Sequence, residues 1–197
     1  VDDEENIYTF DAGYFHGTGN PFGWPRTTRL TVFDKDGNIK NKIDYDPFAE
    51  GRLINPLSVS VDSSGNIWVA NWANFGDYGE IVIFNSEGKF LKKITGISED
   101  KPFAAIGGVL CGKNEVYVSS GTDEAPIAVF DLQGNFVRVL ENCKDTILLP
   151  YQMAFDKQGR LWIVTRAYMV YAVSSIDGTI YKEFQIKGES NALAIDD

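Results

Sequence analysis

The sequence predicts an all-β protein, a β-propeller of about four four-stranded blades. Aromatic residues make up 13% of the 197 residues, and 19 residues are glycine, a composition that suits short strands joined by tight turns. Three segments also align with one another, and each contains four apolar or alternating stretches separated by polar turns. Four antiparallel strands make one propeller blade. The length suits one well-buried core, so we expect a single domain over residues 1–197.

The three clearest repeats cover residues 56–94, 104–140 and 150–186. Each begins with a short apolar strand, followed by a polar turn, an alternating strand, a variable loop, and two further strands joined by a second turn. The second strand is clearest at Ile67-Trp68-Val69 and Leu161-Trp162-Ile163, which both follow a turn containing glycine. Such a turn between alternating stretches predicts a hairpin, because glycine adopts a positive φ without strain.

The two ends of the chain predict one more repeat. Residues 6–43 supply a second, third and fourth strand, and residues 192–197 match the missing first strand. We therefore expect the two ends to build one blade together, which would leave no free strand edge in a closed ring. The alternative is a part of a larger, six-bladed propeller. The chain begins with Val1 rather than Met, which fits a processed mature form or an excised piece.

One repeat, VSVDSSGNIWVANWANFGDYGEIVIFNSEGKFLKKI, contains a strand, Asp-x-x-Gly-Asn, Ile-Trp-Val-Ala, a loop, Ile-x-Ile-Phe and a Gly-Lys turn. This order resembles the consensus blade of the NHL and SMP-30-like propellers. The resemblance covers nearly the whole chain and implies the propeller fold. It does not fix an activity, because that group includes protein- and RNA-binding modules, lactonases and lyases.

Charge and cysteine content limit the classes of function. The chain has 18 basic and 28 acidic residues, a net charge of −10, and no basic cluster longer than Lys92-Lys93, so we expect no nucleic-acid partner. No apolar stretch approaches ~18 residues, so we expect no membrane insertion. The acidic, cysteine-poor composition suits a secreted or periplasmic protein. Cys111 and Cys143 are predicted to be free thiols, with a single bridge as the alternative.

The candidate binding residues are the aromatic and basic side chains of the loops between second and third strands. In a blade these loops lie at the same end as the connections into each first strand, and loops on a rigid scaffold often carry binding residues. Large amphipathic rings dominate binding hot spots. We therefore expect a binding or scaffolding module for a protein, peptide or glycan. The alternative is that the aromatic residues of the first loop fold back over the blade as a lid and bind no partner. The candidates are Tyr14, His16, Trp24, Arg26, Trp72, Phe75, Tyr78, Arg166 and Tyr168.

The alternative function, a lactonase or lyase, comes from the family resemblance. The lactonases of that group hold a divalent cation, such as calcium, with carboxylate and amide oxygens on the channel axis, and the matching candidates here are Asp11, Asn55, Asn71 and Asn191. The binding module requires no cofactor. His16 is the only histidine, which excludes a multi-histidine metal site. Residues 34–38 resemble the opening of a calcium loop, but similar turns recur at 85–89 and 131–135 without the second acid, so we interpret them as turns.

Overall fold

The structure is a computed structural model and describes residues 2, 4–14, 25–45, 50–72, 78–121, 125–188 and 192–195. Strands dominate these residues, and the helical element among them is the 3₁₀ turn η1 (Glu141–Cys143). The predicted all-β fold class is confirmed. Within the described ranges, no helix is long and apolar enough to cross a membrane.

The strands form four larger antiparallel sheets, and in each the strands pair in chain order. The first sheet contains β1 (Ile7–Tyr14), β2 (Pro25–Phe33) and β3 (Ile39–Tyr45). The second contains β4 (Pro56–Val61), β5 (Ile67–Trp72), β6 (Gly79–Phe84) and β7 (Phe90–Ile94). The third contains β10 (Ile106–Cys111), β11 (Glu115–Ser120), β12 (Ile127–Asp131) and β13 (Phe136–Val139). The fourth contains β14 (Pro150–Phe155), β15 (Arg160–Thr165), β16 (Met169–Ser174) and β17 (Ile180–Gln185).

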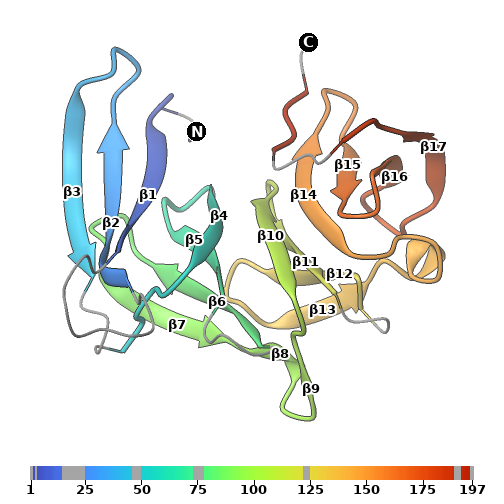
Figure 1. Cartoon of the computed structure of the whole chain (residues 1–197), viewed down its shortest axis with the longest axis horizontal. Coiled ribbons are helices and arrows are strands. Elements are labelled where there is room, and N and C mark those ends of the chain that lie inside the picture. Colours follow the sequence, from blue (N-terminus) through green and yellow to red (C-terminus); the bar gives the residue numbers. More distant parts are fainter. Residues whose placement is uncertain are drawn as a thin grey trace.

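The four sheets follow one another along an arc, with the first strand of each sheet on the inner side (Figure 1). A small hairpin of β8 (Gly96–Ser98) and β9 (Lys101–Pro102) projects between the second and third sheets. Each of the three aligned repeats therefore folds as one four-stranded sheet.

The arrangement of the chain ends differs from the expectation. The first sheet has three strands, and residues 192–195 form no strand; residues 196 and 197 lie outside the described residues. The two ends of the chain lie apart in Figure 1, where the last described segment is drawn next to β14. Among the described residues, 192–195 therefore do not add a strand to the first sheet, and the arc is not a closed ring.

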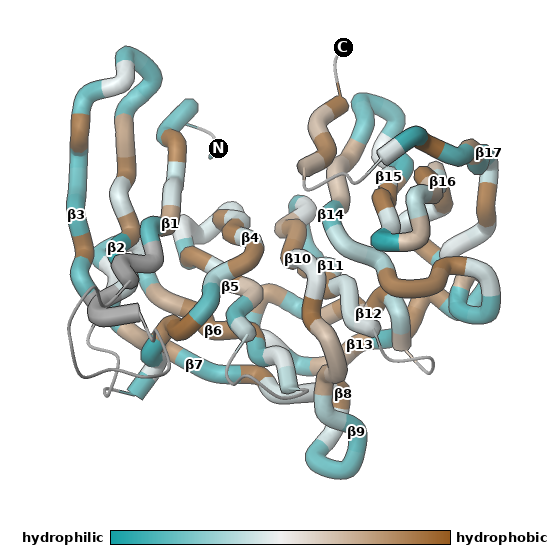
Figure 2. Tube along the Cα trace, in the orientation of Figure 1, coloured by the Kyte–Doolittle hydropathy of each residue, from teal (hydrophilic) through white to brown (hydrophobic). Residues whose placement is uncertain are grey.

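The core is divided into three apolar layers, each between two successive sheets. Leu30 of the first sheet packs with Ile67 and Val82 of the second. Trp68, which is fully buried, packs against residues of the third sheet. A third layer joins the third and fourth sheets. Figure 2 shows the matching distribution, with apolar residues concentrated along the strands and hydrophilic residues at turns such as β2–β3 and β8–β9.

An aspartate turn recurs between strands and anchors two of the tryptophans. In the second sheet, Asp62 Oδ1 accepts the N–H groups of Ser64 and Asn66, and Oδ2 accepts the Trp68 indole N–H at 2.9 Å. Asp156 binds the indole of Trp162 in the same way at 2.8 Å. Asp34 closes residues 34–38 through the same backbone bonds. The interpretation of that segment as a turn is confirmed.

Candidate binding surface

Backbone hydrogen bonds at one end of three sheets determine where a binding surface can form. The N–H at or just after the end of the second strand donates to the connection that leads into the first strand. The bonds are Trp72 to Asn55 O (2.9 Å), Gly121 to Ala105 O (2.7 Å) and Arg166 to Leu149 O (3.0 Å). The end of the second strand therefore lies beside the connection into the first strand in the second, third and fourth sheets.

In the fourth sheet this end carries a cation–π pair. The guanidinium carbon of Arg166 lies 4.8 Å from the centroid of the Tyr151 ring, well within the range for such an interaction. Arg166 is exposed and Tyr151 is half-buried. Thr165 orders the loop, because its carbonyl accepts the N–H of Tyr168 and its hydroxyl accepts the N–H of Met169, both at 3.2 Å. The pair is therefore held on a short, hydrogen-bonded hairpin loop.

Two exposed residues beside this pair have left-handed backbone conformations. Tyr168 has φ 63° and Leu149 has φ 50°, yet their side chains remain 40% and 50% exposed. The residue of a short hairpin loop with positive φ is customarily glycine, and a larger residue there costs about 1–2 kcal/mol. Burial does not account for the two apolar side chains at these positions. We call Leu149, Tyr151, Arg166 and Tyr168 the Arg166 surface.

The corresponding end of the second sheet contains Asn71, which is fully buried. Its Oδ1 accepts the N–H groups of Ile54 and Asn55, both at 3.0 Å, and its Nδ2 donates to Glu80 Oε1 at 2.8 Å. The amide oxygen therefore holds the connection into β4, while the amide nitrogen is bound to Glu80 on β6. Asn71 has a structural role in this arrangement, and its oxygen is not directed at a ligand.

The predicted candidates whose side chains the structure describes are divided between the second and fourth sheets. Trp72 and Tyr78 belong to the second sheet, whereas Arg166 and Tyr168 lie together on the fourth. Tyr78 is 58% exposed, while the Trp72 indole nitrogen is buried without a hydrogen-bond partner among the described residues. The Tyr14 and Arg26 backbones belong to β1 and β2, but their side chains lie outside the described part. His16, Trp24 and Phe75 lie wholly outside it.

The structure describes three of the four residues of the metal-dependent alternative. Asp11 on β1 and Asn55 before β4 are exposed, Asn71 is used internally, and Asn191 lies outside the described residues. In the part of the chain that the structure describes, no three His, Cys, Asp or Glu side chains are grouped so that they could hold a metal ion.

Two members of the Arg166 surface were not among the predicted candidates. Tyr151 is the second residue of β14, and only its pairing with Arg166 across the backbone contact makes it part of a surface. Leu149 has no distinctive sequence feature, because a left-handed leucine is not predicted from its neighbours.

Comparisons with known proteins establish similarity of fold alone. No family model and no curated protein matches the chain. Among solved structures, a protein of unknown function from Bacteroides caccae is 15% identical with a TM-score of 0.50, and the match covers 83% of this chain and 62% of that one. The extracellular domain of a protein from B. thetaiotaomicron assigned to the hybrid two component systems is 17% identical with a TM-score of 0.56, over 88% of this chain and 22% of that one. The chain thus spans less than two thirds of either.

Proposed function

We propose that the chain is a binding module that holds a peptide segment of a partner protein on the Arg166 surface. The observation that carries the proposal is the backbone strain at Tyr168 and Leu149, two exposed apolar residues in left-handed conformations. Strained residues that packing does not require are characteristic of ligand-contacting sites. Their position beside the Arg166–Tyr151 pair supports a contact role, because aromatic residues and arginine dominate the energetic centres of protein interfaces.

The proposed architecture is that of an NHL-like propeller, in which the four sheets are blades. The order of the sheets along the arc and the position of each first strand on its inner side support this. A ring of four blades and a part of a larger ring both fit such an arc. In either case the Arg166 surface belongs to one end of the fourth blade, where loops on a rigid scaffold commonly bind ligands.

We also propose a location outside the cytoplasm, in the periplasm or beyond the cell. Support comes from the structural neighbour that is itself an extracellular domain.

The proposal is tested by selecting random displayed peptides on the wild-type protein and measuring their affinities by calorimetry. Peptides that use the Arg166 surface should lose about tenfold or more in affinity on Arg166→Ala, as expected for a central interface residue. Arg29→Ala removes a similar side chain from the first sheet, where Arg29 pairs with Asp44 at 2.6 Å, and should leave the affinity unchanged. If no selected peptide distinguishes Arg166→Ala from Arg29→Ala, this surface is not the binding site.

A further inference from the structure

A second site is indicated by a cavity of about 550 Å³ at the second sheet. Its walls come from the connection before β4, with Glu50 and Arg52, and from β6 and β7, with Glu80, Phe90 and Lys93. We propose that this cavity binds a small monocarboxylate with a hydroxylated body, of the sugar-acid type. The proposal does not depend on the Arg166 surface, which belongs to a different sheet.

The charged side chains that line the cavity are Arg52, Lys92, Lys93, Glu50 and Glu80, with a net charge of +1. Glu80 is almost fully buried and is already compensated, because Lys93 Nζ lies 3.4 Å from its Oε2 and Asn71 donates to its Oε1. Lys92 Nζ donates to the carbonyls of Gln133 and Gly134 at 3.1 and 2.9 Å. Arg52 is exposed and forms no hydrogen bond or ion pair with any other residue that the structure describes. Its guanidinium is therefore free to bind a ligand.

The chemistry of Arg52 favours a carboxylate over a phosphate. A guanidinium presents a planar fork that matches a carboxylate through two parallel hydrogen bonds. A lining of net charge +1 balances a monoanion, whereas a phosphate dianion would remain half-compensated in a chain of net charge −10. The charge balance therefore selects a singly charged ligand.

The rest of the lining favours hydroxyl groups on the ligand. The Glu50 carboxylate is exposed at the cavity and can accept hydrogen bonds from hydroxyl donors. Phe90 supplies an apolar side, and its ring fixes the neighbouring loop. A Cβ on Gly51, whose φ is 78°, would overlap Phe90 Cδ2. Only glycine fits this contact, so the backbone that carries Arg52 is placed by the ring. An orienting cation, a hydroxyl acceptor and an apolar wall together suit a polar small molecule.

The test is a calorimetric or NMR titration of the whole chain with glucuronate at constant ionic strength. Glucose lacks the carboxylate, acetate lacks the hydroxyls, and inorganic phosphate carries the higher charge. We expect glucuronate to bind about tenfold or more tightly than each of the three, since a charge-assisted pair and the hydroxyl contacts are both required. Equal binding of phosphate, of glucose or of acetate would overturn the proposed ligand class.

Arg52→Gln should weaken glucuronate binding about tenfold or more, because it removes the proposed carboxylate partner and no other described contact. Lys113→Gln removes the same charge from an exposed position outside the cavity and should change the affinity by less than about twofold. Equal affinities of the two variants, or no glucuronate binding by the wild type, would overturn the site. Arg166→Ala should leave glucuronate binding intact, which distinguishes failure here from failure of the peptide site.

Discussion

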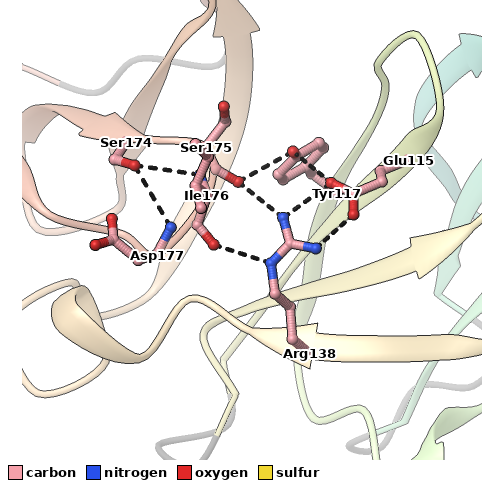
Figure 3. A network of polar contacts seen from close by, with 7 residues as sticks. All are labelled: Glu115, Tyr117, Arg138, Ser174, Ser175, Ile176 and Asp177. Carbon is pink, nitrogen blue, oxygen red and sulfur yellow. Dashed lines mark hydrogen bonds and ion pairs between the residues drawn. The ribbon is translucent and has the colours of Figure 1, made fainter.

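Arg138 on β13 forms a bidentate ion pair with Glu115 on β11, with N–O distances of 2.5 and 2.8 Å (Figure 3). The same guanidinium donates from Nε to the carbonyl of Ile176 at 2.9 Å and from Nη2 to that of Ser175 at 3.1 Å. Tyr117 donates to the Ser175 carbonyl as well. Because Ser175 and Ile176 lie in the β16–β17 turn, one arginine fastens the third sheet to the fourth.

We expect Arg138→Met to destabilise the protein by about 1–3 kcal/mol in denaturant unfolding. The change removes the Arg138 donors from the Glu115 carboxylate and from the Ser175 and Ile176 carbonyls, and the pair is partly buried, with side chains 28% and 32% exposed. The control is Arg29→Met, which breaks the exposed Arg29–Asp44 pair on the first sheet and should cost clearly less. Equal losses for the two variants would show that the contacts to the fourth sheet contribute nothing.

The same pair predicts a dependence of stability on pH. The Arg138 guanidinium holds the pKa of Glu115 below its ordinary value of 4.5. A lowered folded-state pKa stabilises the fold above the unfolded-state value, and this contribution is lost as the pH falls through the folded-state pKa. Between about pH 5 and pH 3 the wild type should therefore lose more stability than Arg138→Met. Parallel pH profiles of the free energy of unfolding would contradict this.

The aspartate turns allow a matched pair of substitutions. Asp62 Oδ2 accepts two side-chain N–H groups, one of them from the buried Trp68 indole. An asparagine at this position would put an NH₂ group in place of this oxygen, so that a donor would face two other donors. We expect Asp62→Asn to cost about 2 kcal/mol, as for a buried donor left without an acceptor. Asp34→Asn alters the same kind of turn without an indole bond and should cost less, because water reaches its donors. Thermal unfolding of both variants measures the difference, and an equal loss would assign no stabilisation to the indole bond.

The sequence predicts the repeats well because their determinants are local. The Asp-x-x-Gly turns and the alternating stretches beside Trp68 and Trp162 fix each hairpin through neighbouring residues. The expected pairing of the two chain ends is not seen at residues 192–195, because such pairing depends on how the sheets are arranged along the arc and not on neighbouring residues. The Arg166 surface was found in part. Arg166 and Tyr168 were identified from residue type, while Leu149 and the cavity at Arg52 depend on a backbone conformation and on packing between distant segments.

The two cysteines are free thiols in the structure, as predicted. Burial raises the pKa of Cys111 to about 12 and that of Cys143 to about 11. Since only the thiolate reacts with disulfide reagents, both thiols should resist labelling at pH 8 in the native state and react once the protein unfolds. Labelling at pH 8 with and without denaturant checks this. Native-state labelling at the rate of free cysteine would show that the thiols are accessible.

The left-handed backbone at Tyr168 gives the sharpest test of the proposed function, because strain and binding predict opposite effects of one substitution. Tyr168→Gly relieves the steric cost at φ 63°, while glycine adds freedom to the unfolded chain and the partly buried ring is lost. We expect stability to stay within about 1 kcal/mol of the wild type, while peptides selected on the Arg166 surface lose their affinity. Tyr181→Ala removes a ring that is 59% exposed on β17 and should affect neither quantity. If Tyr168→Gly instead destabilises the fold by more than about 2 kcal/mol and leaves peptide affinity unchanged, the ring serves packing rather than recognition.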